Sequence, residues 1–187
     1  MKKYIGENEI SGIYVFGCGD MDSNEKVING IIERVSGPAE AAVAMHLSEM
    51  VNKKLEIIVQ EPKLLQAEAE VLKSKGFQPS TESGYTIDFD KKENGTIVCI
   101  MNRANKEFLP SLLESNWNEN LLPRLLFIGP SPWYFTDTCT TEKMDRFTKL
   151  VKPEYLNFKE GSLGYQCFHE AYIFKLLEKD VEQLFRA

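Results

Sequence analysis

The chain has 187 residues, of which 43% are hydrophobic and 27% are charged, which is enough material for one domain with a packed core. Its formal net charge is −6, which argues against nucleic acid or an anionic membrane surface as a partner, because both require basic patches. No apolar run in the sequence approaches the roughly 20 residues needed to span a bilayer.

The cysteines indicate a reducing compartment. The N-terminal segment turns acidic at Glu7, too early for a signal peptide. The sequence contains no Cys-x-x-Cys pair and no local Cys/His cluster, so we expect no metal site and place the protein in the cytoplasm or the nucleus. The four cysteines are widely spaced, at Cys18, Cys99, Cys139 and Cys167.

The N-terminal part of the chain reads as an arm followed by one strand and two helices. Residues 1–11 have no periodic pattern and are expected to be an arm, while residues 12–187 form a single domain. The first strand is predicted over 12–16, where β-branched and aromatic residues lie between two glycines. Apolar residues at helical spacing predict a helix over 24–35, and a proline suited to a first helical position begins another over 38–52.

The rest of the chain alternates strands with helices. A loop is expected over 78–84, and an edge strand or hairpin arm over 85–89. Core strands are predicted over 55–60, 96–101 and 125–128, with helices over 62–75, 105–115 and 143–151. The tail allows two interpretations: a helix through 165–185, or a strand over 167–176 followed by a helix after Glu178.

This alternation predicts an α/β fold. We expect a three-layer, Rossmann-like domain with a mostly parallel sheet, helices on both faces and room for antiparallel strands at the edges. In such sheets ligands bind at the carboxyl ends of the strands, so the residues that follow each predicted strand are the candidate site residues.

Gly17 and Gly19 follow the first strand and are the first candidates. Glycines at this turn let a backbone approach a phosphate or a cofactor. The third glycine of the dinucleotide motif is replaced by Asp22, and Asp20 and Asp22 would repel a pyrophosphate. A tight strand-to-helix turn therefore stands beside the ligand interpretation.

The other strands also end in polar residues. Glu61 can bind a ribose hydroxyl pair, although its distance from Gly17 exceeds the usual spacing of about 20 residues. It can equally be a carboxylate that stabilises a helix N-terminus. Asn102 and Arg103 follow the third core strand and Ser131 follows the fourth, and Arg103 can hold an anion or lie on an ordinary surface loop.

Two groups of aromatic residues have different interpretations. For Asn116 and Trp117 we favour a structural role, in which the tryptophan attaches a helix end to the core. The aromatic triplet after the fourth strand lies in a loop that begins with two prolines, and it predicts either an exposed contact patch for a protein partner or a lid over a pocket. It comprises Trp133, Tyr134 and Phe135.

No enzyme motif settles the question of catalysis. The sequence lacks a G-x-S-x-G elbow, a P-loop, an H-E-x-x-H pair and the kinase motifs. A catalytic group assembled from distant residues would leave no such signal, so the sequence neither identifies nor excludes an enzyme.

Several of these features, in this order, resemble the SRR (sensitivity to red light reduced) domain family. The resemblance covers about residues 12–135. It comprises the Phe16–Gly19 turn, a strand followed by Glu61-Pro62 and a helix ending before Gly76-Phe77, a strand through Cys99–Ala104, a helix ending in Asn116-Trp117, and the strand end Phe127–Ser131. The family's closing strand is similar to Phe168–Phe174, which favours the strand interpretation of the tail.

The chain departs from the family pattern at several polar positions. The family's histidine after the third strand falls on Arg103, and an asparagine falls on Pro130. Its closing aspartate and histidine fall on Glu170 and Phe174. If those polar residues carry an activity, this chain is a divergent member that has lost several of them.

The resemblance implies a regulatory protein, of the kind linked to light and circadian-clock control in plants, that acts mainly through protein contacts. Cytoskeletal and haem-related roles elsewhere in the family leave the biochemical activity open. Two alternatives remain. One is an enzyme or sensor that binds a nucleoside-type cofactor, such as S-adenosylmethionine or a nucleotide, or that binds haem. The other is an acidic inhibitor or immunity-type binding protein.

Overall fold

The computed structural model describes most of the 187-residue chain. The described residues are 2–5, 10–18, 26–28, 31–33, 37–51, 55–88, 95–136, 141–160, 162, 165, 168 and 170–186.

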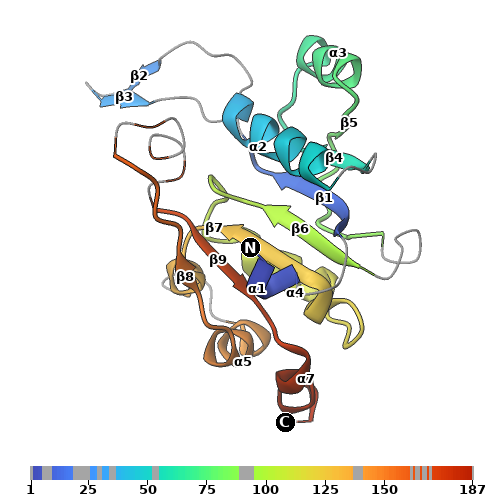
Figure 1. Ribbon diagram of the computed structural model, residues 1–187, viewed down its shortest axis with the longest axis vertical. Helices are drawn as coiled ribbons and strands as arrows, with labels where there is room; N and C mark the ends of the chain where they lie inside the picture. The colour runs from blue at the N-terminus through green and yellow to red at the C-terminus, as the bar shows by residue number, and fades with distance from the viewer. Residues whose placement is uncertain are drawn as a thin grey trace.

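A seven-stranded mixed sheet forms the centre of the protein (Figure 1). Its order is β5 (Gln78–Ser80), β4 (Ile57–Gln60), β1 (Ile10–Phe16), β6 (Thr96–Ile100), β7 (Leu125–Gly129), β9 (Tyr172–Lys175) and β8 (Glu154–Tyr155). The first five strands are parallel, and β9 runs antiparallel to both β7 and β8. Numbered along the chain, the parallel strands have the order 3-2-1-4-5, which is the Rossmann order. The predicted fold class is confirmed, including the antiparallel edge.

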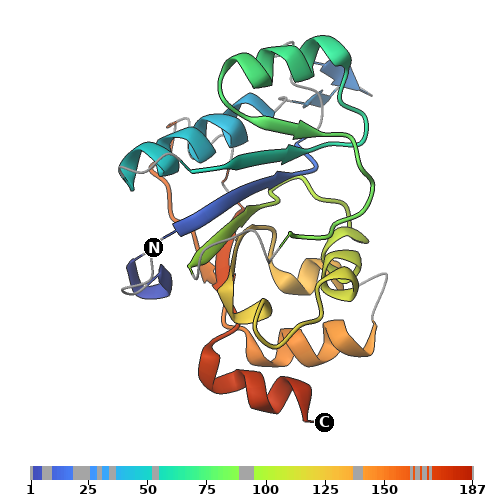
Figure 2. The same cartoon turned by 90° about the vertical axis from the view of Figure 1, so that its right-hand side faces the viewer.

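Helices cover both faces of the sheet (Figures 1 and 2). Helices α2 (Gly37–Met50) and α3 (Gln66–Ser74) share one apolar cluster with one face. Helices α4 (Phe108–Ser115), α5 (Glu142–Leu150) and α7 (Glu178–Phe185) share the other cluster with the opposite face.

The central strands are mostly apolar because both of their faces are covered. Along β1, Ile13 and Val15 belong to the apolar cluster that includes α2 and α3, called the α2 cluster below. Tyr14 and Phe16 belong to the cluster that includes α4, α5 and α7, called the α4 cluster. This alternation follows from the two-residue period of a strand.

The start of the chain differs from the expected pattern. Strand β1 begins at Ile10 rather than residue 12, and helix α1 (Lys2–Ile5) precedes it. The Tyr4 hydroxyl donates a hydrogen bond to the Lys152 carbonyl at 3.4 Å, and the Lys175 ammonium donates to the Tyr4 carbonyl at 3.2 Å. Part of the expected arm is therefore helical and packs onto the domain.

The helix predicted over 24–35 is wrong. Strands β2 (Lys26–Ile28) and β3 (Ile31–Glu33) form a separate antiparallel pair, drawn apart from the main sheet in Figure 1. The sequence between them reads Asn29-Gly30, flanked by β-branched residues. That pattern favours a hairpin turn over a helix, since β-branched side chains are restricted in helices.

Two other local predictions are wrong for physical reasons. The expected loop over 78–84 begins with β5, where Pro79 is tolerated because an edge strand needs partners on one side only. Residues 85–88 contain no strand. Instead, Tyr85 and Ile87 pack into the α4 cluster.

The helix expected over 62–75 is present but begins later, at Gln66 in α3.

The tail follows the strand interpretation. Strand β9 pairs with β7, with Phe174 opposite Phe127, and helix α7 begins at Glu178. Leu184 of α7 is fully buried in the α4 cluster. The core strand predicted over 125–128 and the helices predicted over 38–52, 105–115 and 143–151 are confirmed, with ends shifted by a few residues.

Candidate functional site at the carboxyl edge of the sheet

Five of the six predicted site residues lie on the edge of the sheet where the parallel strands end. Gly17 follows β1, Glu61 follows β4, Asn102 and Arg103 follow β6, and Ser131 follows β7. These four strands are consecutive neighbours in the sheet. Gly19, the sixth, lies outside the described residues.

Gly17 has a structural reason to be glycine. Its φ is +59°, in the left-handed region that side chains other than glycine adopt at a cost. Its amide donates a hydrogen bond of 3.1 Å to the carbonyl of Gln60 on the neighbouring strand β4. A Cβ atom would meet the Ala104 Cα at 3.7 Å, which is ordinary contact, so the backbone conformation rather than crowding selects glycine.

The ends of β1 and β4 are acidic and buried. Glu61 is 7% exposed, and one of its carboxylate oxygens accepts a hydrogen bond of 3.0 Å from the amide of Lys63. Glu40, in the first turn of α2, is fully buried. The pKa of the Cys18 thiol is raised to about 12, first by burial and then by the negative charges of Glu40 and Glu61. Two carboxylate groups therefore lie near this thiol.

This charge distribution is unfavourable for a phosphate. In dinucleotide-binding proteins the pyrophosphate sits at the N-terminus of the helix after the first strand. Here the first turn of α2 holds the Glu40 carboxylate instead. Glu40 lies two residues after Pro38, so the sequence alone places it in the first turn of the predicted helix, where a carboxylate is favourable. Its burial depends on packing that one sequence does not reveal.

The ends of β6 and β7 are packed tightly against each other. A Cβ atom on Gly129 would lie 2.9 Å from both the carbonyl oxygen and the Cγ of Met101, so this position requires glycine. Beyond this contact, Asn102 is half-buried and Arg103 is exposed. The Ser131 hydroxyl oxygen is buried and has no hydrogen-bond partner in the described part of the chain.

The aromatic triplet does not act as one surface. The 3-10 turn η2 (Pro132–Phe135) leaves Trp133 56% exposed and Tyr134 41% exposed, but buries Phe135 completely. The expectation that all three aromatics form an exposed patch is therefore wrong for Phe135, which the turn directs into the α4 cluster. The Lys106 ammonium lies 5.5 Å from the centroid of the Tyr134 ring.

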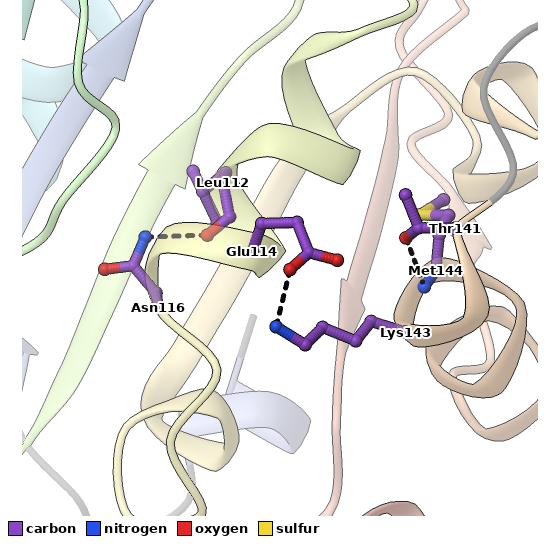
Figure 3. A network of polar contacts seen from close by, with 6 residues as sticks. All are labelled: Leu112, Glu114, Asn116, Thr141, Lys143 and Met144. Carbon is purple, nitrogen blue, oxygen red and sulfur yellow. Dashed lines mark hydrogen bonds and ion pairs between the residues drawn. The ribbon is translucent and has the colours of Figure 1, made fainter.

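Asn116 has a structural role, as expected. It is 4% exposed and ends helix α4. Its side-chain oxygen accepts a hydrogen bond of 2.8 Å from the Ile87 amide, and its nitrogen donates to the carbonyls of Tyr85 at 2.6 Å and Leu112 at 2.7 Å. Figure 3 shows the bond to Leu112 at the helix end.

Trp117 joins three helices, and this role also matches the expectation. Its ring packs against Phe185 of α7, with centroids 5.2 Å apart. The Lys143 ammonium of α5 lies 5.5 Å from the Trp117 ring and forms an ion pair of 2.5 Å with Glu114 of α4 (Figure 3). The pair Asn116-Trp117 is thus explained by packing and capping.

Within the described ranges, no three His, Cys, Asp or Glu side chains are grouped so that they could hold a metal ion. None of the helices there has the length and apolar character that crossing a membrane requires.

Comparison with known proteins gives the family. No curated protein matches the chain in sequence. Among solved structures, the chain is similar to one described as an rRNA methylase from Streptococcus thermophilus, with a TM-score of 0.40, 9% sequence identity, and coverage of 91% of this chain and 89% of that one. A likeness of this strength says nothing about activity. The family model of the SRR1 domain matches residues 2–173, and the chain therefore belongs to the SRR1 domain family.

Proposed function

We propose that this SRR1 domain protein is a regulator that acts mainly through protein contacts, and that a partner docks on Trp133 and Tyr134. The observation that carries the proposal is the exposure of these two side chains, 56% and 41%, on the 3-10 turn η2 at the carboxyl edge of the sheet. The proposal includes a regulatory role of the light-signalling or circadian type, exercised in the cytoplasm or the nucleus.

The turn that carries the two aromatics is stabilised by ring packing and by hydrogen bonds within residues 131–136. The Tyr134 ring contacts the buried Phe135 ring edge-on, with centroids 5.2 Å apart. The Tyr134 amide donates to the Ser131 carbonyl at 2.9 Å, and the Thr136 hydroxyl donates to the Trp133 carbonyl at 2.8 Å. Exposed tryptophan and tyrosine on a fixed backbone are typical of interaction hot spots, because little entropy is lost when they are covered.

Affinity capture tests this function. The wild-type chain and the double variant Trp133→Ala/Tyr134→Ala are used as baits in an extract of the source organism, with quantitative mass spectrometry. A hot-spot pair contributing about 2 kcal/mol or more predicts about a 30-fold loss of the specific partner. Val71→Ala, which truncates a side chain that is 60% exposed on α3, is the matched control and should keep the partner.

The folded state should be unaffected in both variants, since exposed side chains contribute little to stability. Equal capture by the wild type and the double variant would rule out this surface as the contact.

A second candidate is a site for a nucleoside-type ligand without phosphate groups, such as S-adenosylmethionine. The observation in its favour is that Gly17 and Glu61 lie at the ends of adjacent strands in a Rossmann-ordered sheet, where a carboxylate can bind ribose hydroxyls. The buried carboxylates of Glu40 and Glu61 favour a positively charged ligand over a phosphate. Asn102, Arg103 and Ser131 would line the other side of this site.

Thermal-shift measurements test the second candidate. S-adenosylmethionine at about 100 times its Kd would stabilise the fold by about 2.7 kcal/mol, because it binds only the folded state. ATP, NAD and haem are run in parallel, and the Glu61→Gln variant should lose the shift while the exposed Glu160→Gln control keeps it. An equal shift with ATP would contradict the argument from charge, and the absence of any shift would remove the candidate.

A further inference from the structure

The C-terminal helix α7 packs onto the domain through one narrow apolar stripe. Val181, Leu184 and Phe185 lie at positions i, i+3 and i+4, and therefore on one side of the helix. Leu184 is fully buried, while Val181 and Phe185 are partly buried against the same α4 cluster. Figures 1 and 2 both show α7 at one end of the molecule, beside α5. The stripe thus provides the apolar contacts of α7 with the domain.

The surface under α7 is built by residues outside that helix. The Trp117 ring, just after α4, packs against Phe185 with centroids 5.2 Å apart. The Lys143 ammonium of α5 lies 5.5 Å from the centroid of the Trp117 ring and forms an ion pair of 2.5 Å with Glu114 of α4. These contacts with α4 and α5 position the indole without any residue of α7. We call the surface of α4, α5 and Trp117 that α7 covers the helix-docking face.

Helix α7 is short and depends on this packing. It has eight residues, fewer than the roughly 12–15 that an isolated helix needs, and its N-cap residue Leu177 makes no side-chain capping bond. It also follows the residues 2–173 that the SRR1 domain model matches, whereas α4, α5 and Trp117 lie within them. The helix-docking face therefore belongs to the SRR1 domain, and α7 to the segment after it. A terminal helix of this kind opens locally at a lower free energy than the core.

We propose that the helix-docking face binds an amphipathic helix of a partner protein, and that α7 competes with this partner from within the same chain. The partner helix carries apolar side chains at i, i+3 and i+4, as α7 does, with an aromatic ring at the last position against Trp117. Grooves that bind amphipathic helices recognise such anchors. The partner binds only molecules in which α7 has opened, so its apparent affinity is reduced by that fraction. This surface is independent of the contact proposed for Trp133 and Tyr134.

A second copy of the chain fits the helix-docking face less well. Exchange of α7 between two copies would restore the same contacts of Leu184 and Phe185 that each copy already makes, and would add none at this face. The exchange would still cost the translational and rotational freedom of association. A partner helix can add contacts beyond the eight residues of α7, which offsets that cost.

A peptide titration followed by NMR tests the proposal. A synthetic peptide of residues 176–186 is added to the ¹⁵N-labelled 187-residue chain and to its Leu184→Ser/Phe185→Ser variant, in which α7 has lost two anchors. We expect the variant to bind the peptide at least tenfold more tightly than the wild type, with a shift of the Trp117 indole N–H signal. The chain has two tryptophans, and Trp133→Phe identifies the signal of Trp117. The peptide with Phe185→Ser should lose binding, and the peptide with Gln183→Ser should keep it.

The matched control is Lys179→Ser/Gln183→Ser, which changes two exposed residues of α7 and should bind the peptide no better than the wild type. Equal affinity of the wild type and the Leu184→Ser/Phe185→Ser variant would overturn the proposal. The absence of peptide binding to this variant, when circular dichroism shows it folded, would do the same. A dimer in which Trp117 stays covered, detected by analytical ultracentrifugation, would assign the face to a second copy and overturn the partner.

Hydrogen exchange of the wild type gives a test that does not depend on how the variant folds. The amides of α7 should exchange by local opening, faster than those of α4 and α5 and with little dependence on low denaturant. Exchange of the α7 amides only through global unfolding would overturn the proposal, because the face would then never be free. None of these failures affects the capture experiment with Trp133 and Tyr134, which tests the proposed function separately.

Discussion

Replacing Asn116 by alanine should destabilise the protein strongly, because one side chain holds together segments that are distant in the sequence. The segment 81–88 connects edge strand β5 to central strand β6 and has no regular structure of its own. Its backbone polar groups at Ile87 and Tyr85 are paired by the Asn116 amide group, which is 4% exposed. The alanine variant removes the hydrogen-bond partners of these backbone groups, while the packing around the groups stays in place.

The magnitude follows from the individual hydrogen bonds. The Ile87 amide would become a buried donor without its partner, and such a donor costs about 1–3 kcal/mol. The Tyr85 carbonyl loses a bond of 2.6 Å, which adds about 1 kcal/mol. The Leu112 carbonyl keeps a bond of 3.1 Å from the Asn116 backbone amide, so its loss is smaller. We expect a decrease of about 3 kcal/mol in the free energy of unfolding.

Urea denaturation at constant m value measures this change directly. A loss of about 3 kcal/mol corresponds to a decrease in Tm of about 6–12 °C for a chain of this size. Hydrogen exchange at the Ile87 amide is the local readout and should accelerate more than exchange in β6. Asn118→Ala is the control, because Asn118 is exposed and its side chain accepts bonds from the nearby amides of Asn120 and Leu121. A loss below about 1 kcal/mol in Asn116→Ala would refute the assigned role.

Two further predictions concern buried positions of the carboxyl edge. Gly129→Ala should lower the free energy of unfolding by about 1–3 kcal/mol in urea denaturation, because its Cβ would lie 2.9 Å from the Met101 carbonyl oxygen, whereas Gly84→Ala, with nothing within 4 Å, should change it little. Burial, followed by nearby carboxylate charge, raises the pKa of Cys18 from 9.0 to about 12, so the unfolded thiol ionises first and stability should fall as the pH rises from 9 towards 12. The stability of the Cys18→Ala variant should fall less steeply over that pH range. The same slope of stability against pH in the variant and the wild type would contradict this reasoning.

The central sheet could be predicted because its strands are recognisable in the sequence by their apolar composition. Strands β1, β6 and β7 are short apolar segments, and both of their faces are buried, so no alternation was needed to recognise them. Because parallel strands end at one edge of a sheet, the sequence also predicts that the polar residues after these strands lie along that edge.

Spacing along the sequence was a poor guide to neighbours at this edge. The long gap between Gly17 and Glu61 argues, from the sequence alone, against their forming one site. In the structure, Phe16 is in register with Gln60, so the residues that follow them also lie on neighbouring strand ends. The gap contains β2, β3 and α2, which lengthen the connection without separating the strands.

Contacts between distant segments could not be predicted. The interaction of Asn116 with Ile87 and Tyr85 joins residues 29 and 31 positions apart, and no periodic pattern encodes it. Phe135 was grouped with its exposed neighbours because composition does not show which side of a short turn faces the core.

The carboxyl edge has buried carboxylates at one end and exposed aromatic side chains at the other. This difference separates the two functional proposals. At the ends of β1 and β4, the carboxylates of Glu40 and Glu61 are buried, which suits a small ligand enclosed by the fold. At the ends of β6 and β7, Trp133 and Tyr134 are exposed, which suits a macromolecular partner. Glu61→Gln should therefore leave partner capture unchanged, and Trp133→Ala should leave any ligand-induced thermal shift unchanged. If one substitution abolishes both, the two halves form one site, and the partner would then bind where the ligand does.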